Sequence, residues 1–99
     1  MSRKYGKPDA NHSEIVGALK AIGATVCDLK AVGGGVPDLL VGYHGRNYLM
    51  EVKDGNKAPS AAKLNTVQVL WHKQWGGQAD IVRSVDEAIA LLNRAVRRE

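Results

Sequence analysis

Apolar and polar positions follow two different periods along this chain, and together they predict seven elements. Helical spacing of apolar residues runs over about 11–22 and 61–75, and again from 84 onward. Runs typical of β-strands occupy 25–32, 38–43, 47–53 and 79–83. Three strands in succession predict an antiparallel meander, and the fourth follows a helix and is expected to lie parallel to its neighbour. We therefore expect an α/β fold, a mixed central sheet flanked by helices in the order αβββαβα.

Polar residues predict where two of the helices begin. Asn11-His12-Ser13-Glu14 and Ser84-Val85-Asp86-Glu87 have the form of capping boxes, and Pro59-Ser60 introduces the middle helix. The buried face of the first helix is expected to hold Ile15, Val16, Leu19 and Ile22, and that of the last helix Ile89, Leu92 and Val96. Trp71 and Trp75 share a helical face with leucine, which is more typical of core residues than of base-stacking residues.

Composition narrows the class of protein. The 99 residues suffice for one domain, here 11–99, after a flexible basic arm over 1–10. Fourteen Lys and Arg against ten Asp and Glu give a formal charge of +4, which favours a polyanionic partner. Lone Cys27, the lack of a long apolar run and the lack of a signal peptide indicate a reducing, cytoplasmic setting without a membrane partner, and no zinc-type Cys/His cluster is present.

Three charged residues on two neighbouring strands are the strongest candidates for chemistry. Asp38 follows Pro37 at the start of one strand, and Glu51 and Lys53 end the next. Side chains two apart on a strand share a face, so Glu51 and Lys53 are expected to point together. Two carboxylates suit Mg²⁺, and an adjacent ammonium can offset charge on a reacting phosphate. A turn-bracing aspartate and a strand-edge ion pair are the ordinary alternatives.

The pattern Pro37-Asp38, then Glu51-Val52-Lys53, resembles the PD-(D/E)XK nuclease superfamily. Together with Gly35-Val36-Pro37-Asp38-Leu39-Leu40 and downstream Gln68, it is most similar to the VRR-NUC family, over about 11–92. This resemblance implies a metal site formed by Asp38, Glu51 and the carbonyl of Val52, with a contribution from Glu14. It also implies catalytic roles for Lys53 and Gln68.

Two of these residues have competing structural interpretations. Glu14 is also placed to cap the first helix, a role that would explain it completely. Gln68 lies in an apolar stripe, where its amide needs partners: either backbone at the sheet edge, or the catalytic water, Lys53 or a phosphate. We favour the second interpretation for Gln68 and leave both open for Glu14.

The resemblance implies a Mg²⁺- or Mn²⁺-dependent endonuclease acting on branched or duplex DNA without an organic cofactor. Stand-alone members of the family are associated with cleaving four-way (Holliday) junctions, and the two symmetric cuts that a junction needs imply a homodimer. They are also associated with phage, which implies the cytoplasm of a bacterial or phage-infected cell. The alternatives are a nuclease for flaps or other DNA repair intermediates, and a catalytically silent DNA-binding module. Candidate phosphate contacts are Lys57, Lys63 and the arm residues Arg3, Lys4 and Lys7.

Overall fold

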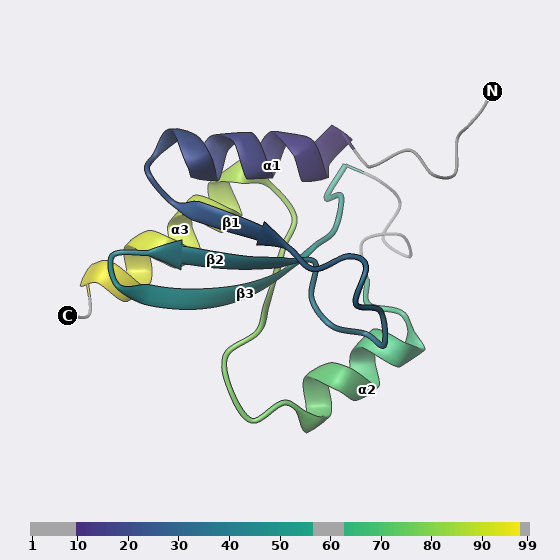
Figure 1. Cartoon of the computed structure of the whole chain (residues 1–99). Helices are drawn as coiled ribbons and strands as arrows, with labels where there is room; N and C mark the ends of the chain where they lie inside the picture. The colour runs from purple at the N-terminus through teal and green to yellow at the C-terminus, as the bar shows by residue number, and fades with distance from the viewer. Residues whose placement is uncertain (1–9, 57–62, 98–99) are drawn as a thin grey trace.

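The computed structural model describes residues 10–56 and 63–97, and within them the elements follow the predicted order (Figure 1). The helices are α1 (Ala10–Ala21), α2 (Thr66–Gln74) and α3 (Val85–Arg97). The strands are β1 (Thr25–Asp28), β2 (Leu39–Tyr43), β3 (Arg46–Val52) and β4 (Asp80–Val82). The predicted α/β architecture is confirmed. No helix in the described ranges has the length and apolar character needed to cross a bilayer.

The sheet has the order β1-β2-β3-β4 and is mixed, as predicted. β1, β2 and β3 pair antiparallel, whereas β4 pairs parallel to β3 after the crossover through α2. In the β2–β3 hairpin, Leu39 lies opposite Met50. The start of β2 therefore lies beside the end of β3, which brings together the two segments that carry the candidate charges.

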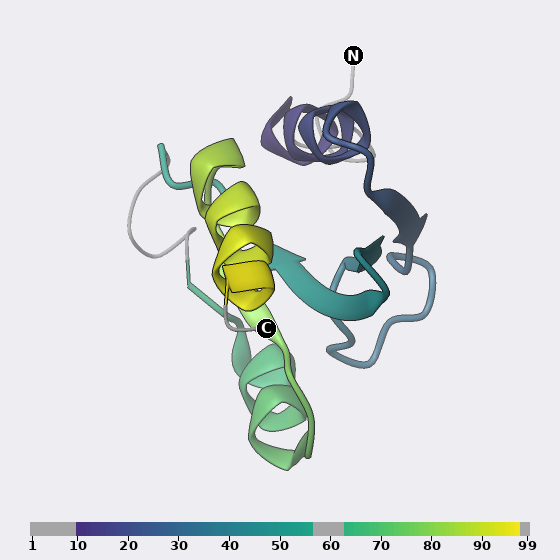
Figure 2. The same cartoon turned by 90° about the vertical axis from the view of Figure 1, so that its left-hand side faces the viewer.

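One face of the sheet forms the core with α1 and α3. Alternate strand residues are buried on it, among them Leu39, Val41 and Met50. Ile15 and Leu19 of α1 and Leu92 of α3 are fully buried in the same cluster. The two helices lie against each other on this side, and α2 lies on the far side from α1 (Figures 1 and 2). Glu51 lies between the core residues Met50 and Val52, so its side chain is on the opposite face of β3.

The first predicted capping box is wrong, and only half of the second is observed: Ser84 caps α3, but the carboxylate of Glu87 accepts the N–H of Arg83 instead of that of Ser84. α1 begins at Ala10, so Asn11 lies inside the helix; its side-chain amide donates to the carbonyls of Lys53 (2.7 Å) and Arg83 (3.3 Å). At α3, the hydroxyl of Ser84 accepts from the N–H of Glu87 at 3.1 Å. Asn11 thus joins the start of α1 to the ends of β3 and β4 instead of capping a helix. Ile22, expected in the core, is 37% exposed because α1 has already ended.

Two elements are shorter than predicted, for local reasons. β1 ends at Asp28, whose carboxylate accepts the N–H of Lys30 at 2.8 Å and turns the chain out of the sheet. α2 begins at Thr66 because Asn65 caps it with a complete capping box. Pro59-Ser60, the predicted start of this helix, lies outside the described residues.

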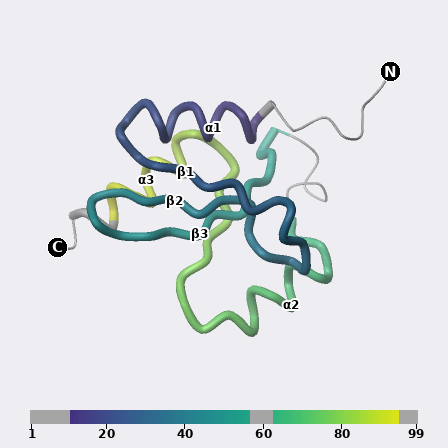
Figure 3. The backbone as a smooth tube through the Cα atoms, in the orientation of Figure 1, coloured from purple at the N-terminus to yellow at the C-terminus, as the bar shows by residue number. Residues whose placement is uncertain are grey.

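α2 packs against the glycine-rich loop that precedes β2 (Figure 3). None of the residues of α2 is buried. The prediction that its tryptophans belong to the core is wrong: Trp75 is 47% exposed, and its ring stacks on that of Trp71 with centroids 4.7 Å apart. The closest approach is at Gly35, where an added Cβ would lie 2.7 Å from the carbonyl oxygen of Val67 and 2.9 Å from the Cβ of Trp71.

Replacing Gly35 tests this contact, and Gly34 provides a matched control. Both have positive φ, +86° and +66°, but a Cβ on Gly34 would meet nothing within 4 Å. We expect Gly34→Ala to cost about 1 kcal/mol of stability from backbone strain. Gly35→Ala should cost about 1–3 kcal/mol more, because α2 must move away. Urea denaturation measures both, and equal losses would show that the loop and α2 are not in close contact.

Candidate active site

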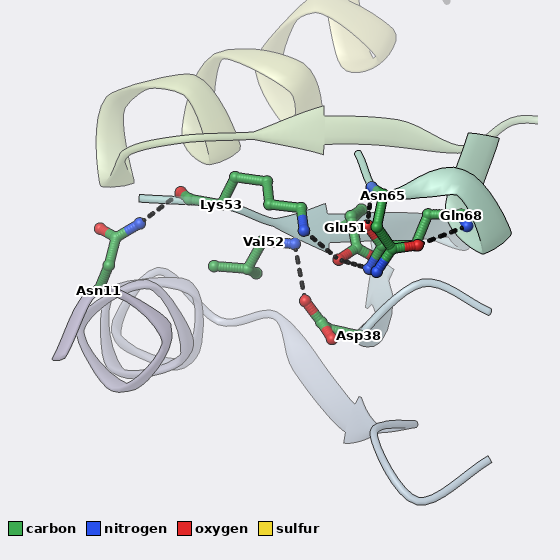
Figure 4. Close-up of polar contacts among 7 residues, drawn as sticks. All are labelled: Asn11, Asp38, Glu51, Val52, Lys53, Asn65 and Gln68. Atoms are coloured by element: carbon green, nitrogen blue, oxygen red, sulfur yellow. Dashed lines mark hydrogen bonds and ion pairs between the residues drawn. The ribbon is translucent and has the colours of Figure 1, made fainter. Parts of the chain in front are cut away.

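The hairpin register places Asp38 against the backbone of β3. Asp38 immediately precedes β2, and its Oδ2 accepts the N–H of Val52 at 2.9 Å (Figure 4). This hydrogen bond holds the carboxylate beside Val52, the last residue of β3, which directly follows Glu51. The carboxylate of Asp38 is thus anchored to β3 close to that of Glu51, and only one of its oxygens takes part in this bond.

Glu51 is the centre of the site. Its side chain is 2% exposed, and its Oε2 accepts from Nε2 of Gln68 at 2.9 Å and lies 3.8 Å from Nζ of Lys53. Figure 4 shows Lys53 and Gln68 converging on this carboxylate from β3 and α2. The other oxygen, Oε1, is buried and has no hydrogen-bond partner among the described residues. Glu51 therefore has one oxygen fixed by neighbours and one available for a further ligand.

The surroundings of Glu51 make its ionisation unfavourable. Burial and, to a smaller extent, the negative charge of Asp38 raise the pKa of Glu51 from its ordinary 4.5 to about 7, and the positive charge of Lys53 opposes this rise. A buried carboxylate with a like-charged neighbour is more stable when protonated or when a cation lies beside it. The site therefore favours a bound cation at neutral pH.

The donor atoms at this place fit a hard divalent cation. Asp38, Glu51 and the carbonyl of Val52 are all oxygen donors, and Glu51 has an unpartnered buried oxygen. Within 10–56 and 63–97, no group of three or more His, Cys, Asp and Glu side chains is placed to hold a metal. Mg²⁺ suits such a site, because it commonly takes one or two carboxylates and completes its shell with water and phosphate oxygens.

The structure does not bring Glu14 to the two carboxylates. Glu14 is exposed on α1 and lines a separate cleft with Asn56 and Arg83. Neither its predicted metal role nor its predicted capping role is supported by this position. Lys63 is exposed shortly before α2. The remaining predicted DNA contacts lie outside the described residues: Arg3, Lys4, Lys7 and Lys57.

Asn65 belongs to the site and was missed in the sequence. Its side chain accepts the N–H of Gln68 at 2.9 Å, and Oε1 of Gln68 accepts the N–H of Asn65 at 3.0 Å. Because Oε1 is used in this way, Nε2 of Gln68 is turned toward Glu51. The spacing Asn65-x-x-Gln68 before an apolar run is a capping-box signal that could have identified both residues.

A structural comparison places the fold among known proteins. A solved structure described as a VRR_NUC domain is similar to this chain with a TM-score of 0.57 and 25% sequence identity. The similarity covers 83% of this chain and 89% of that one. No family model matches the sequence, and no curated protein matches it. The fold is thus shared over most of both chains.

The raised pKa of Glu51 gives a stability test. Between its ordinary pKa of 4.5 and about 7, the folded state keeps a proton that the unfolded state loses, so stability falls as pH rises through this window. Glu51→Gln removes this penalty. In chelator, we expect the variant to be more stable than the wild type at pH 8, by up to about 3 kcal/mol, and similar at pH 4.

Chemical denaturation at the two pH values measures this difference. Glu14→Gln is the matched control, because Glu14 is exposed, and it should show no pH-dependent gain. A Glu51→Gln protein that is less stable than the wild type at pH 8 would contradict the assignment. It would mean that Lys53 and Gln68 stabilise the charged carboxylate more than burial and Asp38 destabilise it.

Proposed function

We propose that this chain is a DNA endonuclease that requires Mg²⁺ or Mn²⁺. Its resemblance to the VRR-NUC family is confirmed by its structural similarity to a VRR_NUC domain. The nuclease is of the PD-(D/E)XK type. One observation carries the proposal: Asp38, Glu51 and Lys53 converge at one end of the β2–β3 hairpin, an arrangement that suits metal-assisted hydrolysis of a phosphodiester.

Each residue has a role that follows from its position. Asp38, Glu51 and the carbonyl of Val52 would hold the metal, which when bound lowers the pKa of a water and stabilises phosphate charge. The Lys53 ammonium lies 3.8 Å from Glu51 on a side chain that is 16% exposed, and it would offset negative charge that develops on the phosphate. Gln68 holds the Glu51 carboxylate in one orientation by its 2.9 Å hydrogen bond.

The substrate we propose is branched DNA, in particular the four-way junction. A domain of this size has little surface for reading bases, so it would bind mainly phosphates and select DNA by its shape. We propose that Lys63, which is exposed shortly before α2, makes such contacts and that Lys57 and a basic arm with Arg3, Lys4 and Lys7 extend them. A nuclease for flaps or other repair intermediates is the alternative with the same chemistry, and a silent DNA-binding module is the alternative without it.

Cutting a junction symmetrically needs two active sites, and we propose a homodimer. Support comes from large exposed apolar side chains at α2: Val67 and Leu70 within the helix are 55% and 54% exposed, and Trp75, which follows it, is 47% exposed. Such a group of exposed apolar residues on one helix is unusual for a monomer and fits contact with a second copy. We do not propose α3 as the dimer contact, because its residues Ala88, Leu91 and Leu92 are buried in the core.

Removing the charged residues tests the chemistry. In Mg²⁺, we expect Asp38→Asn and Lys53→Gln each to lower the rate of cutting by at least about a hundredfold, because the first removes a proposed metal ligand and the second removes positive charge beside the reacting phosphate. Binding, measured by fluorescence anisotropy in chelator, should stay within a few fold. Lys73→Gln, at an exposed lysine of α2, is the control and should cut normally.

The substrates for this assay are linear duplex, flap and four-way junction DNA. Preferred cutting of the junction supports the proposed substrate, and preferred cutting of the flap supports the alternative nuclease. If no metal-dependent product forms on any of the three while binding persists, the nuclease assignment is wrong and the binding module remains.

Sedimentation velocity tests the dimer. We expect the wild type to sediment as a dimer and Leu70→Glu to sediment as a monomer, because a charge within the apolar contact would be left without a partner. Val32→Glu is the control, since Val32 is 62% exposed in the loop before β2. A wild-type monomer that still makes paired cuts in a junction would overturn the argument from two-fold symmetry.

A further inference from the structure

A second cleft lies beside the candidate active site, between α1 and β1. It has a volume of about 490 Å³, and among its lining residues are Lys20 of α1 and Lys30, which follows β1. Leu39 also lines it, and Leu39 directly follows Asp38 in the chain. Leu39, the first residue of β2, therefore joins the wall of this cleft to Asp38, which precedes it in the chain, and the nuclease chemistry makes no use of the cleft.

His12 contributes a buried polar group to this cleft. The side chain of His12 is only 7% exposed, and its Nε2 is buried without a hydrogen-bond partner among the described residues. An unpaired buried nitrogen is costly unless a ligand or a water pairs with it. In the tautomer with the proton on Nε2, this nitrogen is a hydrogen-bond donor, which suits an anionic oxygen.

The charges of the cleft also favour an anion. Lys20 and Lys30 supply two positive charges, whereas Asp28 supplies one negative charge and already accepts the backbone N–H of Lys30 at 2.8 Å. Val26 and Leu39 add an apolar wall. Phosphate groups joined by sugars match this combination of cationic and apolar surface.

We propose that the cleft between α1 and β1, with Lys20, Lys30 and His12, binds a phosphodiester group of the DNA backbone next to the one that is cut. The proposal rests on the proposed nuclease function, since it takes DNA as the ligand. A second phosphate held here would fix the direction of the strand across Asp38 and Glu51. Free inorganic phosphate carries the same chemistry, and the experiment must distinguish the two sources.

The test compares Lys20→Gln/Lys30→Gln with Lys73→Gln in the full chain. Binding of duplex and junction DNA is measured in chelator by anisotropy over a range of salt concentrations. We expect the double variant to bind several-fold to about tenfold more weakly, with the salt slope smaller by about one, as for one lost phosphate contact. The control should keep the wild-type slope. If the salt slope of the double variant equals that of the wild type, the cleft does not bind a DNA phosphate, even if the wild type cuts DNA.

A second measurement follows His12 without replacing it. The ¹⁵N resonances of the His12 imidazole are recorded during titration with DNA in chelator and, separately, with inorganic phosphate. A shift with DNA supports the proposal, whether or not phosphate also causes one. A shift with phosphate alone, or with neither, overturns it. A wild type that binds DNA with the expected changes but never cuts would leave the cleft standing and overturn the nuclease function instead.

Discussion

The burial of Glu51 beside Asp38 is the constraint on which the site depends. Water would solvate both charges, but the fold removes water from Glu51 and holds Asp38 to the backbone of β3 at 2.9 Å. Lys53 and Gln68 offset the loss of hydration only at Oε2 of Glu51. The other oxygen is left in need of a cation, so the folded chain without metal stores unfavourable electrostatic energy at the place where the chemistry is proposed.

The order of elements and the pairing of strands were predictable, because periodicity and chain proximity decide them. A hairpin between 38–43 and 47–53 necessarily brings Asp38 to the end of the next strand, and the structure confirms this with Leu39 opposite Met50. The convergence of Asp38, Glu51 and Lys53 therefore follows from local sequence alone. Gln68 was also identified, although its observed partner is Glu51 and not Lys53 or the sheet edge.

The rest depended on contacts between distant parts of the chain. Asn11 has the sequence context of a helix cap, but carbonyls 42 and 72 residues away bind its amide instead. The tryptophans of α2 have core spacing, yet periodicity shows only which residues share a face and not what covers that face. In this structure the sheet does not cover it. The same limit applies to Glu14, whose position on α1 could not be fixed without knowing where the helix begins.

Gln68 serves two purposes at once, since its side chain closes the capping box of α2 and its amide binds Glu51. The first helical turn and the orientation of the acid are therefore thermodynamically linked: when that turn frays, the carboxylate loses its restraint. The fraction of molecules with a correctly oriented carboxylate then rises with the fraction in which this turn is formed. Anything that orders α2, whether DNA or another protein, would act as an activator without touching the reacting atoms.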